Sequence, residues 1–143
     1  MSLDDELHAF VEDRKQHAAE LIRPALAEGA IVLLDRYYFS TMAYQGARGA
    51  DVARIRRENE AIAPRPDLVL LVDFDPEIAL RRIRESRGDV PNEFEQLDQL
   101  RAIRKIFLDT AAADSTFRII DGSGSPDAVF AQLEAAVASL LAQ

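Results

Sequence analysis

Three short apolar runs, each followed by an aspartate, constrain the fold of this chain more than any other feature of its sequence. The runs cover residues 31–34, 68–72 and 117–120, and the aspartates are Asp35, Asp73 and Asp121. Short apolar runs rich in β-branched residues are typical of strands that are buried on both faces of a parallel sheet. The carboxyl ends of such strands form the edge at which open α/β sheets bind ligands. The sequence therefore predicts three parallel strands whose ends carry functional residues.

Capping residues and prolines mark helices around these strands. Ser2 and Asp5 form a capping-box pattern, and Asp51 is a favourable N-cap for a second helix. Asp75-Pro76 and Ser125-Pro126 each combine an N-cap residue with a proline at the first helical position. The predicted helices cover residues 2–29, 51–62, 76–87, 93–112 and 126–141. Alternating helices and strands are typical of an α/β fold, in which helices flank a parallel sheet.

Length and composition limit the class of protein. With 143 residues, 48% of them hydrophobic, the chain has the size of a single domain over residues 1–143. It contains no run of about 18 apolar residues, so no membrane span is predicted. The absence of cysteine excludes disulfides and thiolate zinc sites and fits a reducing compartment such as the cytoplasm. A net charge of −8 argues against a nucleic-acid partner, which calls for a basic surface.

The segment after the first apolar run has the composition of a ligand-lining surface. Asp35 and Arg36 follow the run directly, and hydroxyl, phenol and amide groups alternate with small residues up to Gly46. The alternative is that the charged pair is only the solvated end of a strand. The polar side chains that follow it favour a binding role; they are Ser40, Thr41, Tyr44 and Gln45.

Phe10 and Arg14 lie four residues apart in the first predicted helix and therefore share one face. An aromatic ring one turn from a guanidinium can stack on a planar base and hydrogen-bond its edge. The alternative is that Phe10 belongs to the core and Arg14 pairs with a neighbouring acid. His17 extends the same face as a structural residue, since His8 is the one other histidine available for a metal site.

Arginines also cluster in the helix that precedes a polar break at residues 88–92; they are Arg81, Arg82, Arg84 and Arg87. Such a run is either a solvated helix face or a set of cations beside a flexible loop. Phosphoryl transfer uses arginines of the second kind to neutralise charge on the transferring oxygens. The sequence alone leaves both interpretations open.

Taken together, these motifs resemble the thymidylate kinase family over nearly the whole chain and in the family's order. The central motif is Asp35-Arg36-Tyr37-x-x-Ser40-x-x-Ala43-Tyr44-Gln45-Gly46, and Phe10-x-x-Asp13-Arg14-x-x-His17 is similar to the family's nucleoside-binding helix. Pro66-Asp67-Leu68 through Asp73-x-Asp75-Pro76-Glu77 matches a strand and the entry to a lid, and Ile120-Asp121-Gly122-Ser123 resembles the loop beside the ATP adenine. The resemblance implies a P-loop nucleoside-monophosphate-kinase-like fold with a lid over residues 84–95.

The resemblance also implies roles for single residues. Phe10 would stack on thymine, Arg14 would bond its exocyclic oxygen, and Tyr44 would crowd the sugar 2′ position. Asp35 and Arg36 would lie at the acceptor phosphate, with Asp35 holding Mg²⁺ indirectly through water. The implied catalytic set is Asp35, Arg36, Arg82, Arg84 and Arg87. The implied substrate-binding set is Phe10, Arg14, Arg36, Ser40, Thr41, Tyr44 and Gln45, and the implied ATP-binding set is Asp121, Gly122 and Ser123.

Two features depart from the family pattern. At the end of the lid, where the family has Asp-Arg before an aromatic residue and a glutamate, this chain has Asn92-Glu93-Phe94-Glu95. The phosphate-binding motif G-x-x-x-x-G-K-[ST] occurs nowhere in the sequence. The resemblance therefore implies a domain that is truncated at its N-terminus and lacks the first strand, the P-loop, a helix and a second strand.

The activity that the resemblance implies is the ATP- and Mg²⁺-dependent phosphorylation of dTMP to dTDP, a step of dTTP biosynthesis. Without a P-loop, we expect this chain to be inactive by itself. Two alternatives remain: a non-catalytic fragment that binds a nucleotide or a protein partner, and another nucleotide or nucleoside kinase of the same superfamily. The resemblance further implies a cytoplasmic homodimer that forms through the first two helices, at residues 2–29 and 51–62.

Overall fold

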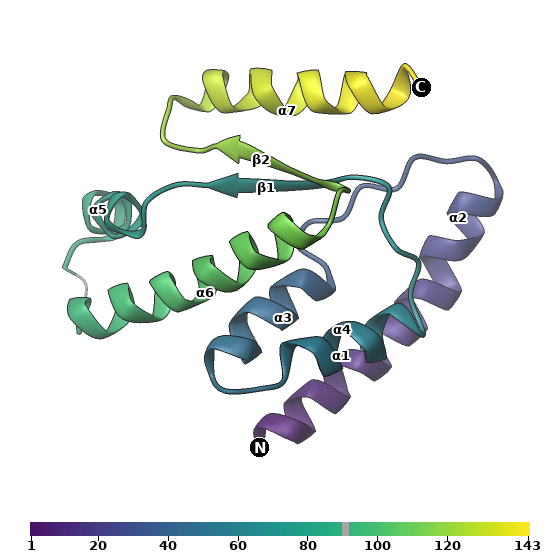
Figure 1. The fold of residues 1–143 in the computed structure, drawn as a ribbon, viewed down its shortest axis with the longest axis horizontal. Helices are drawn as coiled ribbons and strands as arrows, with labels where there is room; N and C mark the ends of the chain where they lie inside the picture. The colour runs from purple at the N-terminus through teal and green to yellow at the C-terminus, as the bar shows by residue number, and fades with distance from the viewer. Residues whose placement is uncertain (90–91) are drawn as a thin grey trace. The chain divides into compact units, whose positions relative to one another are not determined.

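Two units make up the fold, Met1–Arg65 and Pro66–Gln143 (Figure 1). Their description rests on a computed structural model, which describes residues 1–89 and 92–143. The predicted break at residues 88–92 includes Val90 and Pro91, which lie outside the described residues. The expectation of a single domain over residues 1–143 stays a prediction.

The first unit begins with the long helical segment that the capping pattern predicts. Helix α1 (Leu3–His17) starts at Ser2, whose hydroxyl accepts from the Asp5 backbone N–H while the Asp5 carboxylate accepts from Ser2. A π-helical turn, η1 (Ala18–Ile22), leads into α2 (Arg23–Ala27), which carries a proline in its first turn. The predicted helix at residues 2–29 is thus confirmed, with a change of helical pitch before the proline, where a backbone donor is missing.

Two shorter helices pack against α1 and against each other: α3 (Tyr38–Ala47) and α4 (Val52–Glu60). Helix α4 has the predicted N-cap, because the Asp51 carboxylate accepts from the Arg54 N–H at 3.0 Å. Helix α3 was not predicted, since its start has no side-chain cap. Buried side chains from all three helices form the core of this unit; they are Leu7, Tyr38, Phe39, Met42, Ala43 and Ile55.

The prediction that residues 31–34 form a buried strand is wrong. This segment pairs with neither strand of the sheet in the described part of the chain, and it is buried on one side only. Val32 and Leu34 pack on a small cluster built around Ile22, whereas Ile31 and Leu33 are 77% and 88% exposed. The alternation keeps the period of a strand, but a strand also needs a neighbour for its backbone hydrogen bonds, and none is described here.

The second unit contains a parallel pair of strands, β1 (Val69–Asp73) and β2 (Phe117–Asp121). Their register sets Val69 opposite Phe117 and Asp73 opposite Asp121, so both strands end at a carboxylate on the same edge. The parallel arrangement is confirmed, but the sheet described has two strands and not the predicted three.

Three helices accompany this sheet: α5 (Pro76–Arg87), α6 (Glu93–Ala113) and α7 (Pro126–Leu141). Helix α6 packs against both strands and against α5, and α7 runs along β2 (Figure 1). The predicted caps are present, because the Asp75 carboxylate accepts from the Glu77 N–H and the Ser125 hydroxyl from the Ala128 N–H. These capped starts agree with the predicted ones to within a residue.

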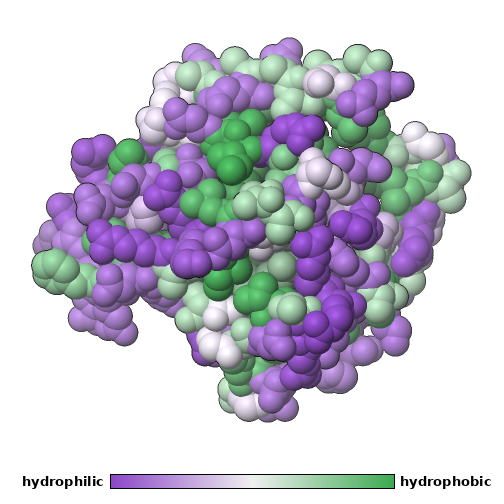
Figure 2. All heavy atoms as spheres, viewed as in Figure 1, coloured by the Kyte–Doolittle hydropathy of each residue, from purple (hydrophilic) through white to green (hydrophobic). Residues whose placement is uncertain are grey.

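The face drawn in Figure 2 carries mostly hydrophilic side chains, with apolar ones exposed in separate patches between them. None of the helices among the described residues is long and apolar enough to span a membrane.

Candidate functional site

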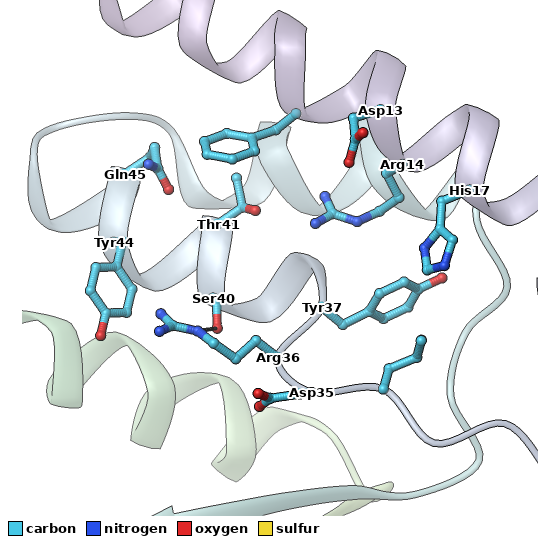
Figure 3. A pocket seen from close by; sticks show the side chains of 12 residues that line it. Asp13, Arg14, His17, Asp35, Arg36, Tyr37, Ser40, Thr41, Tyr44 and Gln45 are labelled. Atoms are coloured by element: carbon cyan, nitrogen blue, oxygen red, sulfur yellow. Dashed lines mark hydrogen bonds between the residues drawn. The ribbon is translucent and has the colours of Figure 1, made fainter.

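A pocket of about 460 Å³ lies within the first unit, between α1, the segment 34–37 and α3 (Figure 3). Its lining combines charged and hydrogen-bonding side chains with apolar ones such as Phe10 and Leu34. The lining residues are Phe10, Asp13, Arg14, His17, Leu34, Asp35, Arg36, Tyr37, Ser40, Thr41, Tyr44 and Gln45. All predicted substrate-binding residues are among them, as are the predicted catalytic residues Asp35 and Arg36.

The floor of the pocket is formed by a backbone segment in an unusual conformation. Arg36 and Tyr37 have φ angles of 68° and 144°, a region in which side chains other than glycine are strained. Contacts within the unit hold this segment in place: the Tyr37 hydroxyl donates to the Pro64 carbonyl at 3.0 Å, and the Ser40 N–H donates to the Tyr37 carbonyl. Burial raises the pKa of the Tyr37 hydroxyl, which stays a donor at neutral pH. Such strain is typical of functional sites, and the Arg36 side chain lines the pocket.

Arg14 is a fixed cation on the α1 side of the pocket. One guanidinium N–H donates to the Asn59 side-chain oxygen at 2.6 Å, and the guanidinium carbon lies 5.5 Å from the centre of the Tyr37 ring. Asn59 is fully buried and donates in turn to the Ile55 carbonyl, so its oxygen is held towards Arg14. Burial lowers the pKa of Arg14, but a guanidinium remains charged in proteins. The remaining N–H groups of the Arg14 fork are available to the pocket (Figure 3).

Arg36 is a second cation, on the floor of the same pocket. Its Nε donates to the Ser40 hydroxyl at 3.0 Å, and its guanidinium lies 4.6 Å from the centre of the Tyr44 ring. The two contacts orient the guanidinium and leave its terminal N–H groups for a ligand. The Asp35 side chain lies nearby at the same end of the pocket (Figure 3).

Thr41 and Gln45 are both buried on α3, one turn apart. The Gln45 amide N–H donates to the Glu6 carboxylate at 2.8 Å, so this carboxylate supports the pocket from α1. Neither Glu6 nor Asn59 was among the residues predicted from the sequence. Each is separated in sequence from the residue it holds, by 39 and 45 positions, and no local pattern connects them.

Four further lining residues were not among the predicted site residues: Asp13, His17, Leu34 and Tyr37. The signal for Asp13 and His17 was present, because they share the α1 face of Phe10 and Arg14 at helical spacing. The alternative interpretation of Phe10 as a core residue is not favoured, since its side chain lines the pocket and is 39% exposed.

The predicted catalytic arginines Arg82, Arg84 and Arg87 lie on α5 in the second unit, and none of them is among the residues that line the pocket. Arg82 donates to the carbonyls of Gly122, Ser123 and Gly124 at 3.1–3.4 Å and covers the Phe74 ring. Arg84 forms an ion pair with Glu93, the acid that replaces the family's usual residue. Arg87 is the last residue of α5. In this conformation Arg82 organises a loop with its guanidinium, and Arg84 is neutralised by Glu93.

The loop after β2 contains the predicted ATP-binding residues and is tightly organised. The Asp121 carboxylate accepts from the N–H and the hydroxyl of Ser123, and these bonds lower the pKa of Asp121. The Gln132 amide donates to the Asp121 carbonyl and accepts from the Asp121 N–H. The Gly122 N–H donates to the Asp73 carbonyl at 2.8 Å, which extends the pairing of the two strands by one bond.

We expect Gly122→Ala to destabilise the second unit. A Cβ at Gly122 would lie 2.6 Å from Phe74 Cδ1 and 2.7 Å from Val72 Cγ1, so either the loop or the ring has to move. Overpacking of this kind costs about 2 kcal/mol. Urea unfolding measures the loss, and Gly124→Ala is the matched control, because its Cβ meets Ala128 at an ordinary 3.4 Å. Equal stability of the two variants would show that the close approach at Gly122 carries no energetic weight.

No cluster of three or more histidine, aspartate or glutamate side chains suited to a metal ion occurs among the described residues. The Asp35 carboxylate fits the predicted role of holding Mg²⁺ through water, since Mg²⁺ in proteins commonly keeps several of its waters and uses one or two carboxylates.

Comparison with known proteins places these features in a family. The family model for thymidylate kinase matches residues 1–133. The chain is 47% identical to a probable thymidylate kinase of Archaeoglobus fulgidus, over 99% of this chain and 70% of that protein. It is 44% identical to a thymidylate kinase of Xanthomonas campestris pv. campestris and to one of Xanthomonas euvesicatoria pv. vesicatoria, over 99% of this chain and 61% of each. The chain thus spans roughly three fifths to seven tenths of these relatives, and it belongs to the thymidylate kinase family of phosphotransferases.

Proposed function

We propose that the pocket of the first unit binds dTMP and that the chain contributes it to a kinase that phosphorylates dTMP to dTDP with ATP. One observation carries this proposal: all residues expected to bind the nucleotide, from Phe10 on α1 to Gln45 on α3, line one pocket with two oriented guanidinium groups. Membership of the thymidylate kinase family supports the same substrate.

The α1 side of the pocket suits the base. The Phe10 ring offers an apolar face for stacking, and Arg14 offers charge-assisted donors to an exocyclic oxygen. Because Asn59 and the Tyr37 ring already hold the guanidinium, little side-chain entropy is lost when the base binds. Thr41 and Gln45 provide further polar groups along the same edge.

The floor of the pocket suits the phosphate. Arg36 is oriented by Ser40 and Tyr44, and its terminal N–H groups match a phosphate oxygen pair. In the proposed reaction, a dTMP phosphate oxygen attacks the γ-phosphorus of ATP as the bond to the ADP oxygen breaks. Arg36 neutralises charge on the acceptor phosphate during this transfer, and Asp35 would hold a bound Mg²⁺ through water. A bound Mg²⁺ supplies charge neutralisation on the phosphates.

For the donor side, we propose that Asp121, Gly122 and Ser123 contact the ATP adenine. The Arg82 guanidinium fixes this loop by donating hydrogen bonds to the backbone carbonyls of the loop. Arg84 and Arg87 belong to the proposed lid at residues 84–95. Phosphate positioning accounts for most of the catalysis in phosphoryl transfer, and the 143 residues contain no P-loop motif. We therefore expect the chain alone to bind dTMP without turning it over, which is also the outcome for a non-catalytic nucleotide-binding fragment.

Calorimetric titration of the 143-residue chain with dTMP, and separately with ATP and Mg²⁺, tests the proposal. We expect saturable dTMP binding and a rise in stability of about 2.7 kcal/mol when dTMP is at 100 times its dissociation constant. The titration with ATP and Mg²⁺ shows whether the loop that contains Asp121, Gly122 and Ser123 binds ATP without a P-loop. Absence of dTMP binding would contradict the proposed function, and formation of dTDP would contradict the expected lack of turnover.

We expect Arg14→Met to weaken dTMP binding about 30-fold, because a charge-assisted hydrogen bond to the base is worth about 2 kcal/mol. Lys15→Met is the matched control, because it removes the same charge from the next position of α1. Among the described residues, Lys15 forms only an exposed pair with Glu12 at 4.0 Å. Circular dichroism verifies that both variants fold. A similar affinity for both variants would rule out the proposed role of Arg14.

The family resemblance also supports two proposals about the whole protein. One is a homodimer that forms through the helical segments at residues 2–29 and 51–62, and the other is a cytoplasmic location. Sedimentation velocity over a range of concentrations measures the first, and cell fractionation the second.

A further inference from the structure

Glu6 forms a polar cluster behind the pocket that the proposed function does not use. Its carboxylate lies on α1, one turn before Phe10, and accepts from the Gln45 amide at 2.8 Å. The same carboxylate accepts from the Arg48 guanidinium at 2.9 and 2.7 Å, one bond to each oxygen. The cluster thus joins the first half of α1 to the C-terminal end of α3, where Gln45 lines the pocket.

The chemistry of this cluster fixes which way the Gln45 amide faces. An ionised carboxylate only accepts hydrogen bonds, so Gln45 has to present its NH₂ group to Glu6 and its carbonyl oxygen elsewhere. The hydrogen bonds from Arg48 and Gln45 lower the pKa of Glu6, so the carboxylate is ionised at neutral pH. Figure 3 shows the Gln45 amide at the pocket edge, with its oxygen on the side of Thr41.

The fixed amide gives the pocket a defined hydrogen-bonding pattern. Gln45 contributes an acceptor, and Arg14, which is held by Asn59, contributes donors. Thr41 does not set this pattern, because a hydroxyl rotates to donate or accept as needed. A pyrimidine with a 4-oxo group and an N3–H is complementary to this pattern. A 4-amino pyrimidine has a donor and an acceptor in the reverse order and is not complementary.

We propose that Glu6 is a positioning residue that sets the orientation of the Gln45 amide and thereby makes the pocket select 4-oxo over 4-amino pyrimidine nucleotides. This inference rests on the proposed function, since it concerns the same pocket. Arg48 supports it by keeping the Glu6 carboxylate charged and in place.

The test compares dTMP with dCMP as ligands of the full 143-residue chain and of Glu6→Gln. A glutamine at position 6 can offer either its oxygen or its NH₂ group, so the Gln45 amide can turn over. We expect the wild-type chain to prefer dTMP, and we expect Glu6→Gln to lower the dCMP-to-dTMP ratio of dissociation constants about tenfold. Glu12→Gln is the matched control, because it removes the same charge from an exposed residue of α1 and leaves the ratio unchanged.

The outcomes separate this inference from the proposed function. If wild type binds dTMP and Glu6→Gln leaves the ratio unchanged, or weakens both ligands equally, then Glu6 is only a structural residue and the inference is overturned while the function stands. If wild type binds neither nucleotide, both are overturned. If Glu6→Gln does not fold, NMR of the wild-type chain decides. We expect the chemical shifts of the Gln45 side-chain NH₂ group to change with pH as the Glu6 carboxyl group titrates. Chemical shifts that do not change over this titration would overturn the inference.

Discussion

Replacing Tyr38 by alanine is expected to destabilise the protein by about 4 kcal/mol, because large aromatic side chains in a packed core cost this much to remove. Tyr38 is fully buried at the start of α3, and its ring packs against those of Tyr37 and Phe39 at centroid distances of 4.9 and 4.3 Å. Since α3 carries Ser40, Thr41, Tyr44 and Gln45, the same variant is expected to lose dTMP binding. Urea unfolding followed by circular dichroism measures the change.

Tyr38→Phe is the matched control, because it keeps the ring and removes only the hydroxyl group. That hydroxyl donates to the Glu60 carboxylate at 3.2 Å, and burial raises its pKa, so it remains protonated. Glu60 keeps its hydrogen bond from Arg56 at 2.8 Å in this variant, so we expect Tyr38→Phe to lower the free energy of unfolding by about 1 kcal/mol or less. If alanine and phenylalanine variants differed by less than 1 kcal/mol, ring packing would not be the main contribution of Tyr38.

The second large effect is expected at Arg104, whose replacement by alanine should destabilise the protein by about 3 kcal/mol. Its guanidinium donates two parallel hydrogen bonds to the Asp73 carboxylate, at 2.8 and 3.0 Å, and these bonds raise the pKa of Arg104. Asp73 ends β1, and its side chain is only 18% exposed. Removing the arginine leaves this carboxylate without its partner, which is costly for a buried pair; partial exposure places the cost at the low end.

Arg101→Ala, one turn earlier on α6, is the control for this effect. Arg101 pairs with Glu77 at 3.1 Å and Asp98 at 3.4 Å, but all three side chains are at least half exposed. Exposed pairs contribute about 0.5 kcal/mol, so the two arginine variants should separate clearly in thermal unfolding. Similar losses would mean that Arg104 acts through its position on α6 and not through Asp73. The double variant Arg104→Ala, Asp73→Ala should recover part of the loss, because no unpaired carboxylate remains.

Local signals in the sequence accounted for most helix starts and for both strands of the described sheet. Ser2, Asp51, Asp75 and Ser125 cap the helices that they were predicted to cap, because a capping bond joins groups two or three residues apart and depends on nothing distant. The shared face of Phe10 and Arg14 followed from helical spacing in the same way. The parallel pairing of β1 with β2 followed from the alternation of helices and strands.

Tertiary contacts decided what these signals left open. The apolar run at residues 31–34 has the composition of a strand, but strand pairing depends on a neighbouring backbone, and the run instead packs one side on the cluster around Ile22. Helix α3 has no local cap and begins after two residues with positive φ, a conformation that contacts such as the Tyr37–Pro64 hydrogen bond hold in place.

In the candidate site, too, local sequence signals and tertiary contacts decide different features. The sequence indicated many of the side chains that line the pocket, because helical spacing on α1 puts Phe10 and Arg14 on one face and because polar residues follow Asp35 and Arg36 directly. Only the tertiary structure decided how two of these side chains are oriented. Asn59 holds Arg14 across 45 residues and Glu6 holds Gln45 across 39, and hydrogen bonds over such separations form only when the path of the whole unit brings α1, α3 and α4 together.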